Sequence, residues 1–207
     1  MRTVIIAFSH IILLVLLTSC NNQNNSKYLQ TIAAHRMQLN EIFFDPAQSP
    51  LDSNAFTHFK GIKFFPVDED YNVTAIIEPI NNAPVFELPH SHNATKPYKH
   101  YGRIKFELKG RSYTLIILEA ANKKVGYENY LLVPFLDETN GANTYGGGRY
   151  IDILKPVGNT LELDFNLAYS PYCAYNSSFT CPVPPKENLL PVKIEAGMKH
   201  DAAMFDN

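Results

Sequence analysis

The chain has 207 residues, of which 45% are hydrophobic and 18% are charged, and its formal net charge is −2. This size and composition fit one ordinary globular domain, and the 13 Phe and 12 Tyr provide enough apolar surface to argue against intrinsic disorder. The near-neutral charge lacks the basic excess typical of nucleic-acid-binding proteins, so we expect no nucleic-acid partner.

The first element in the chain is a predicted signal peptide over residues 1–19. Arg2 supplies positive charge, and the apolar stretch from Val4 to Leu17 is too short and too interrupted for a membrane-spanning helix. It ends in Leu17-Thr18-Ser19-Cys20, which resembles a bacterial lipobox. The resemblance implies that Cys20 becomes the first mature residue and carries acyl chains such as palmitate, which anchor it to a bilayer. The alternative is a plain secretory signal with Cys20 at its boundary.

The residue after the lipobox indicates a location. Some Gram-negative bacteria retain lipoproteins in the inner membrane when Asp follows the cysteine, and Asn21 stands there instead. We therefore expect a lipid-anchored protein of the cell envelope, at the periplasmic face of the outer membrane, with surface display as the alternative. Residues 20–26 form a lipidated polar tether with nothing to bury, and we expect a single globular domain over residues 27–207.

A helix is predicted at the start of this domain. Ser26 is a suitable N-cap, and apolar residues from Leu29 to Ile42 recur at helical spacing. Asp45-Pro46 should end the helix, because proline cannot continue it.

Beyond Tyr71 the hydrophobic pattern changes to a period of two, which is typical of strands with one buried face. Lys109-Gly110 lies between two such runs and predicts a tight hairpin turn. Pro134 interrupts another run, and we expect that strand to be at an edge or bulged. Seven strands are predicted, at Tyr71–Ile77, through Ile104, Phe106 and Leu108, and at Tyr113–Leu118, Tyr130–Leu136, Tyr150–Leu154, Thr160–Leu167 and Val192–Ile194. Strands without intervening helices predict a mainly β fold, an antiparallel barrel or sandwich with one N-terminal helix after the signal peptide.

The C-terminal half contains a dense run of short motifs. They are Asn143-Thr144-Tyr145-Gly146-Gly147-Gly148-Arg149-Tyr150, Leu163-Asp164-Phe165-Asn166, Cys173-Ala174-Tyr175, Cys181-Pro182 and Glu187-Asn188. In order and spacing these motifs resemble the bacterial domain of unknown function 1684 family. The resemblance reaches back to Gly61-Ile62-Lys63-Phe64-Phe65-Pro66 and so covers most of the mature chain. Because that family has no established activity, the resemblance implies a type of domain without implying a mechanism.

Six polar residues of this region form the candidate binding site: Asp137, Tyr145, Arg149, Asp152, Asp164 and Asn166. The three glycines before Arg149 would let backbone amides approach an anion, and the guanidinium would bind carboxylate or phosphate. The alternative is a tight turn in which Arg149 pairs structurally with Asp152, Asp164 or Glu187.

Asp152, Asp164 and Asn166 are predicted by period-two counting to lie on strand faces opposite their apolar neighbours. On a solvated face they would meet water, whereas in the mouth of a small barrel they would line a pocket. In a pocket, Asp152 and Asp164 would be a candidate acid and base, because two carboxylates that share a site separate their pKa values.

A series of tyrosines accompanies these residues, at Tyr145, Tyr150, Tyr169, Tyr172 and Tyr175. Tyrosine offers a ring for packing and a hydroxyl for hydrogen bonding, which suits a pocket for a polar, partly apolar ligand such as a sugar. The alternative is packing in the core and at its rim.

Cys20 leaves Cys173 and Cys181 as the other two of the three cysteines. In an oxidising compartment this pair predicts a disulfide, which would contribute about 2–3 kcal/mol by the chain-entropy model. Free thiols are one alternative, and a metal site completed by His90 and His92 is another. Structural zinc sites usually have more closely spaced Cys pairs, so we expect no metal.

Familiar motifs of hydrolases, metalloproteases and dinucleotide-binding proteins are absent from the sequence. We therefore expect no cofactor and favour a lipid-anchored envelope protein that binds a small molecule or an envelope protein. One alternative is an envelope hydrolase that uses Asp and Arg residues of the same pocket. The other is a structural lipoprotein in which the motifs only build the fold.

Overall fold

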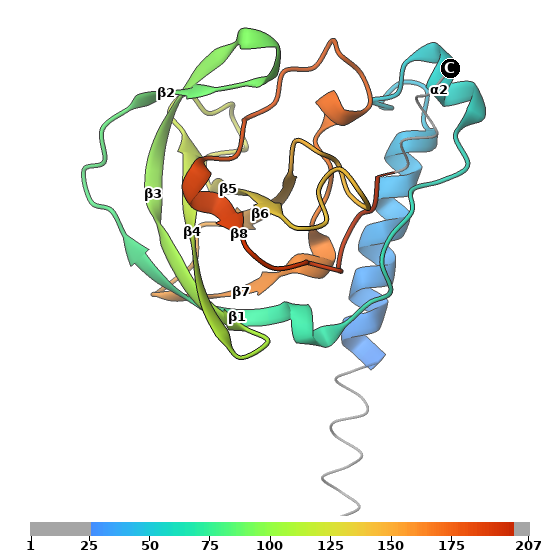
Figure 1. Ribbon diagram of the computed structural model, residues 1–207. Helices are drawn as coiled ribbons and strands as arrows, with labels where there is room; N and C mark the ends of the chain where they lie inside the picture. The colour runs from blue at the N-terminus through green and yellow to red at the C-terminus, as the bar shows by residue number, and fades with distance from the viewer. Residues whose placement is uncertain (1–25, 201–207) are drawn as a thin grey trace, which may run out of the picture. The chain divides into compact units, whose positions relative to one another are not determined.

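The structure is a computed structural model that describes residues 26–200 (Figure 1). The predicted signal peptide, Cys20 and most of the tether lie outside the described residues. The chain divides into two compact units, residues 1–39 and residues 40–207. The predicted single domain over residues 27–207 stays a prediction.

The predicted helix is confirmed over residues 26–44. At its end the N–H of Asp45 donates to Glu41 O at 3.0 Å, and the Asp45 carboxylate accepts the N–H of Ala47 at 2.9 Å. The turn that follows contains Pro46, as the sequence predicts. Among the helices of residues 26–200, none is both long enough and apolar enough to cross a membrane.

Residues 40–200 form a mainly β structure, which confirms the predicted fold class. The sheet has eight strands in the order β6-β5-β4-β3-β1-β7, with β2 beside β3 and β8 beside β5, and it curls into a half-barrel (Figure 1). All pairs are antiparallel except β5–β8. The strands are β1 Asn72–Pro79, β2 Phe86–Pro89, β3 Thr95–Leu108, β4 Arg111–Ala120, β5 Tyr130–Asp137, β6 Arg149–Leu154, β7 Thr160–Asp164 and β8 Leu189–Leu190.

Short helices precede the first strand or lie between later strands. They are α2 Ser53–His58 and five 3-10 turns: η1 Glu69–Tyr71, η2 Ser91–Asn93, η3 Phe165–Leu167, η4 Tyr172–Ala174 and η5 Lys186–Asn188. The helix α2 and the strand β2 were not predicted. Asp52 caps α2 through a carboxylate that accepts the N–H of Ala55 at 2.8 Å.

The two long strands β3 and β4 show why local sequence suffices for part of this sheet. Lys109 and Gly110 have φ of 50° and 73°, as a two-residue hairpin requires, and Leu108 pairs with Arg111. Further along β3 the register shifts between His100 and Gly102. A Cβ on Gly102 would lie 2.8 Å from Glu78 O, so glycine allows β1 to approach this irregular point.

The two faces of the sheet bury different clusters. The inner face carries the main core, which includes Ile104, Phe106, Leu115, Ile117, Val133, Phe135, Ile151, Leu163 and Phe165. The opposite face carries a smaller cluster of Leu88, Ile116 and Leu118, against which Phe86, Tyr98 and Leu132 pack. Because the sheet is apolar on parts of both faces, the alternation along single strands is incomplete.

The strand with Pro134 is not an edge strand, so the edge alternative of the prediction is wrong, and the alternative of a bulged strand remains a prediction. β5 lies between β4 and β6, and its ladder to β4 consists of the single pair Leu118–Leu132. Beside Pro134, where β4 and β5 do not pair, the Asn188 side chain lies between the two strands. Its Oδ1 accepts the N–H of Ile116 at 2.6 Å. Its Nδ2 donates to Ile116 O at 2.9 Å and to Pro134 O at 2.6 Å. A side chain distant in sequence therefore replaces the bonds that proline prevents.

Two other predicted strands also need correction. β7 ends at Asp164, because Asp164 caps the turn η3 over the residues that follow. Val192–Ile194 is not a strand. The N–H of Ile194 donates to the Asp137 side chain at 2.8 Å, and Val192 O accepts from Glu138 N at 3.2 Å, so this backbone bonds outside a regular ladder.

Candidate functional site

Two of the predicted site residues, Arg149 and Asp137, lie together inside the protein. Arg149 begins β6 and Asp137 ends β5, and Nη2 of Arg149 is 3.2 Å from Oδ1 of Asp137. Both side chains have 0% exposure. The guanidinium also donates to the carbonyl oxygens of Ala196 and Ile194, at 2.5 and 2.8 Å. Burial lowers the pKa of Arg149 and Asp137 opposes this effect, but a guanidinium remains protonated.

The glycines before Arg149 serve this packing. Gly148 has φ of 94°, and a Cβ on it would lie 2.6 Å from Phe135 O. The other carboxylate oxygen of Asp137 accepts the hydroxyl of Thr139 at 2.7 Å and the N–H of Ile194 at 2.8 Å. Arg149 therefore has a structural ion pair, as the alternative held, but its partner is Asp137 and not Asp152, Asp164 or Glu187 as the sequence suggested. Because the side chains of Arg149 and Asp137 are both enclosed, their geometry does not support contact with a ligand.

Asp164 and Asn166 form a second buried group, at the end of β7. Oδ1 of Asp164 accepts the N–H of Asn166 at 2.8 Å and its Nδ2 at 3.0 Å. The Asn166 amide also bonds to the backbone of Asp68, accepting its N–H at 3.1 Å and donating to its carbonyl at 2.7 Å. Both residues are buried, so the predicted solvated face is wrong for them, because their side chains satisfy backbone groups of a turn.

Asp152 lies apart from the other predicted acids. It sits on β6, whereas Asp164 sits on β7 at the other end of the strand order, and the two carboxylates bond to different partners. Arg149 and Asp152 are three residues apart on one strand, so they project from opposite faces. The neighbouring Ile151 belongs to the main core, which places Asp152 on the face of the smaller cluster.

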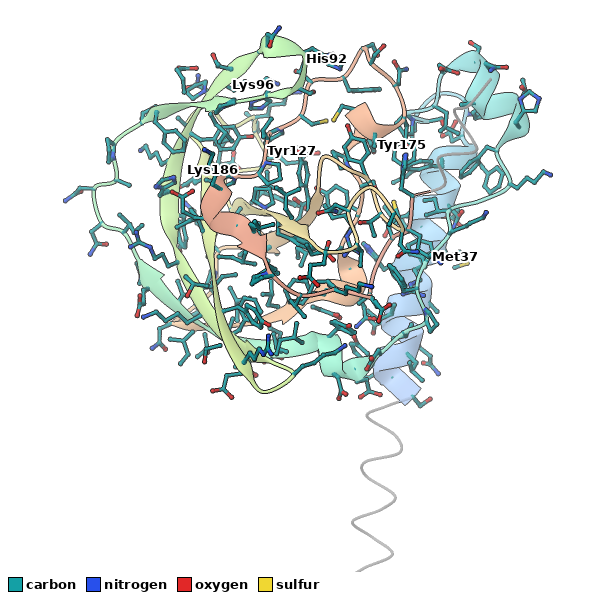
Figure 2. The ribbon with its side chains drawn as sticks, viewed as in Figure 1. Met37, His92, Lys96, Tyr127, Tyr175 and Lys186 are labelled. Carbon is teal, nitrogen blue, oxygen red and sulfur yellow. The ribbon has the colours of Figure 1, made fainter. Side chains whose placement is uncertain are left out.

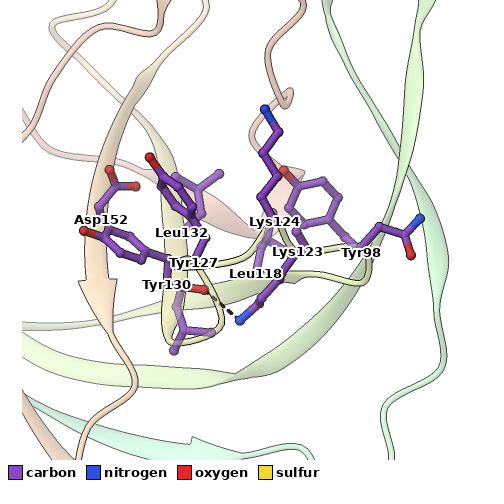
Figure 3. A pocket seen from close by; sticks show the side chains of 11 residues that line it. Tyr98, Leu118, Lys123, Lys124, Tyr127, Tyr130, Leu132 and Asp152 are labelled. Carbon is purple, nitrogen blue, oxygen red and sulfur yellow. Dashed lines mark hydrogen bonds between the residues drawn. The ribbon is translucent and has the colours of Figure 1, made fainter.

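A pocket opens at Asp152 on this second face (Figure 3). Its volume is about 530 Å³, and it is lined by residues from β3, β4, β5, β6 and the β4–β5 loop. Leu118 and Leu132 are cross-strand partners, and Leu132 pairs with Asp152, so these side chains form one row across three strands. In Figure 3, Asp152 and Tyr130 lie on one side of the pocket, with Tyr98 and Lys124 on the other.

The Asp152 carboxyl is partly withdrawn from water. More than a third of the residue's surface is exposed, and partial desolvation of its carboxyl by the surrounding protein raises its pKa. Tyr169 donates its hydroxyl to Oδ2 at 3.0 Å and opposes the rise. Burial, with a smaller contribution from Asp152, raises the pKa of Tyr98 and of Tyr172. Of these tyrosines, Tyr169 contacts the Asp152 carboxyl directly.

The pocket at Asp152 combines apolar, aromatic and charged side chains. A second hollow, over β1, β3 and β4, has charged residues such as Lys105 and Glu107, but both are exposed. Lys123 of the first pocket is already engaged, with Glu119 at 2.9 Å and with Glu128 O and Tyr130 O at 2.6 and 3.0 Å. Besides Lys123, the charged side chains that line this pocket are Asp152 and Lys124.

Tyr145, Cys173 and Cys181 form a separate group of side chains. Both cysteines are free thiols, so the predicted disulfide is not formed in the structure and stays a prediction. The N–H of Cys173 donates to Sγ of Cys181 at 3.2 Å, and Tyr145 hydrogen-bonds to the Cys173 side chain. Among residues 26–200, no three His, Cys, Asp or Glu side chains are grouped to hold a metal ion.

Comparison with known proteins identifies the domain. The family model described as "Protein of unknown function (DUF1684)" matches residues 57–199. The chain belongs to this family. The solution NMR structure of an uncharacterized protein from Haloarcula marismortui is similar to this chain, with 33% sequence identity and a TM-score of 0.68. The similarity covers 86% of this chain and 97% of that chain. No curated protein matches the chain.

The DUF1684 match includes Asp152, Cys173 and Cys181, but it does not extend to Cys20. Within this domain the sequence prediction missed Tyr98, Tyr127 and Tyr130, which line the pocket. Tyr127 packs on Tyr130 with ring centroids 5.1 Å apart. The signal for them was weak, since they lie in a loop and at strand ends rather than in the motif region.

Proposed function

We propose that this DUF1684 protein is lipid-anchored in the cell envelope and that its domain binds a small polar molecule in the pocket at Asp152. The single observation that carries the binding proposal is the Asp152 carboxyl, which accepts the Tyr169 hydroxyl at a pocket of about 530 Å³ whose wall includes Tyr98, Tyr127 and Tyr130. Ligand pockets typically combine apolar and aromatic walls with a few polar groups that fix orientation.

The chemistry of the pocket favours a ligand with hydrogen-bond donors. An ionised Asp152 accepts hydrogen bonds only, and Tyr169 supplies one of them. Hydroxyl or ammonium groups of a sugar, an amino sugar or an amino acid would supply the others. The exposed rings of Tyr127 and Tyr130 would cover the ligand's less polar face, since tyrosine combines an apolar ring with a polar hydroxyl.

The hydrolase alternative loses its structural basis. It requires Asp and Arg residues in one pocket, but Arg149 is enclosed on the core side of β6 while Asp152 opens on the other side. The structural-lipoprotein alternative explains the buried networks of Arg149 and Asp164. It does not explain why a carboxyl with a raised pKa lies at a pocket.

The binding proposal is tested with a panel of sugars, amino sugars and amino acids. Binding to the parent chain is measured by isothermal titration calorimetry and compared with Asp152→Asn and with Glu107→Gln, an exposed carboxyl outside the pocket. For a bound compound, Asp152→Asn should weaken affinity by about tenfold or more, because a hydrogen bond to a charged group contributes about 1.5–3 kcal/mol. Equal affinity of the parent and Asp152→Asn would remove the pocket from the proposal.

The lipid anchor rests on the lipobox residues Leu17-Thr18-Ser19-Cys20. The test is growth with labelled palmitate, comparing the parent with Cys20→Ala. The parent should incorporate label and fractionate with membranes, whereas Cys20→Ala should remain an unlabelled precursor. Label retained by Cys20→Ala would refute the anchor without affecting the binding proposal.

A further inference from the structure

We infer that Cys173 and Cys181 form a redox-active dithiol, in which Cys173 attacks small-molecule disulfides and Cys181 completes an internal disulfide. This activity is separate from ligand binding at Asp152. It rests on the contacts around the two thiols, on their unequal burial and on the way neighbouring segments hold them.

The first observation is that the two sulfurs are held together by different segments. Cys173 lies in the turn η4, and its N–H donates to Sγ of Cys181 at 3.2 Å. Cys181 is fixed against Ser91: its N–H donates to Ser91 Oγ at 3.0 Å, and its carbonyl accepts the N–H of Ser91 at 2.9 Å. Beside this contact His90 pairs with Pro182 in a β-bridge. The Cys181 sulfur therefore lies against the backbone of Cys173 in the folded chain.

The second observation distinguishes the roles of the thiols. Cys173 is partly exposed, whereas Cys181 is buried. Side-chain hydrogen bonds from Cys181, Ser91 and Tyr145 converge on Cys173 and lower its pKa, although burial opposes them. The hydrogen bond with Cys173 and burial raise the pKa of Cys181. An accessible sulfur with a low pKa is the attacking thiol of such pairs, and the buried one is the resolving thiol.

The surroundings also favour a thiolate. Lys96 lies beside His92 at the end of the β2–β3 hairpin (Figure 2), and its charge acts on both His90 and Cys181. Tyr145 keeps its own proton and so acts as a donor, because burial and the charge of Cys173 raise its pKa. Hydroxyl donors stabilise negative charge on the Cys173 sulfur, and the charge of Lys96 favours the thiolate of Cys181 when that residue loses its proton.

With glutathione disulfide as the oxidant, the exchange has two steps. The Cys173 thiolate attacks one glutathione sulfur, the glutathione S–S bond breaks, and a glutathione thiolate leaves and takes a proton from water. Cys181 then loses its proton to water and attacks the Cys173 sulfur, the bond from Cys173 to glutathione breaks, and the second glutathione thiolate leaves and takes a proton from water. Two electrons pass from the cysteines to glutathione disulfide, yielding two glutathione thiols and one Cys173–Cys181 disulfide.

The test uses the full chain carrying Cys20→Ser, so that Cys173 and Cys181 are its only cysteines. Alkylation by iodoacetamide is followed by mass spectrometry as a function of pH. Cys173 should react first, with an apparent pKa about one unit or more below the ordinary thiol value of about 8.5. Tyr145→Phe should move that pKa upward, whereas Tyr113→Phe, which changes a tyrosine of β4, should not.

Equilibration with mixtures of reduced and oxidised glutathione tests reversibility. The disulfide should form and disappear as the glutathione ratio is changed, without unfolding. The Cys181→Ser variant should instead accumulate a mixed disulfide between Cys173 and glutathione. Three results would overturn the inference: equal alkylation of both thiols, failure to oxidise in glutathione disulfide, or a disulfide that reduced glutathione leaves intact in the folded chain. The last result would indicate a purely structural disulfide.

Discussion

Arg149 and Asp137 form an ion pair, 3.2 Å from Nη2 to Oδ1, in which neither side chain is exposed to water. The pair links the end of β5 to the start of β6, and the carbonyls of Ala196 and Ile194 bind the same guanidinium. A residue that resembled an anion-binding group in the sequence therefore joins strands to the C-terminal segment. Because both charges are removed from water, loss of either side chain would leave the other charge buried without a compensating partner.

The first prediction concerns this pair. Arg149→Met should lower the free energy of unfolding by about 3–5 kcal/mol, since removal of one partner leaves the Asp137 charge buried. Urea unfolding at pH 7 measures the change. Arg103→Met, at an exposed position of β3, should change stability by no more than about 0.5 kcal/mol. A loss no larger for Arg149→Met than for Arg103→Met would show that the buried pair contributes little.

The second prediction separates backbone strain from steric clash at Gly197. Gly197 and Gly110 have similar φ, 76° and 73°. A Cβ on Gly197 would lie 2.6 Å from Ala168 O, whereas a Cβ on Gly110 would meet nothing within 4 Å. Gly110→Ala should cost about 1–2 kcal/mol for its left-handed backbone. Gly197→Ala should cost at least about 1 kcal/mol more in thermal or urea unfolding. Equal losses would argue against close packing at Gly197.

The third prediction concerns Asn188, which bridges β4 and β5. Asn188→Ala leaves three buried backbone groups of Ile116 and Pro134 without their partner, and a loss of about 3 kcal/mol is expected in urea unfolding. Asn129→Ala is the matched control at an exposed position and should be nearly neutral. If Asn188→Ala were as stable as Asn129→Ala, water would have to form hydrogen bonds with the backbone groups of Ile116 and Pro134 in place of Asn188.

The fourth prediction follows from the raised pKa of Asp152. The folded carboxyl holds its proton more tightly than the unfolded one, so stability falls as pH rises from the unfolded pKa through the folded pKa. Asp152→Asn still accepts the Tyr169 hydroxyl but cannot ionise. It should be more stable than the parent at pH 7, and the difference should shrink below the ordinary Asp pKa of about 3.9.

Thermal unfolding across this pH range measures the effect, with Glu107→Gln as an exposed control whose difference from the parent should depend little on pH. A difference between Asp152→Asn and the parent that is the same at pH 7 and in acid would contradict the raised pKa.

The sequence predicted correctly those elements that are determined by the backbone preferences of a few adjacent residues. Asp45-Pro46 ends a helix, and Lys109-Gly110 turns a hairpin, because these residues restrict or permit backbone angles wherever they occur. Pro134 was misleading, since its missing N–H suggested an edge. The strand is interior because Asn188, far along the chain, supplies the bonds to β4.

The candidate site shows the same division. The alternation along β6 implied that Arg149 and Asp152 lie on opposite faces, but both faces of this sheet carry apolar clusters. Which face is closed and which opens to a pocket depends on the segments that cover each one. The sequence by itself determined the mainly β class, the hairpin, the N-terminal helix and the DUF1684 resemblance. The tertiary structure alone decided that Arg149 is enclosed and that Asp152 shares a pocket with tyrosines of β3 and the β4–β5 loop, because burial is set by contacts between distant segments.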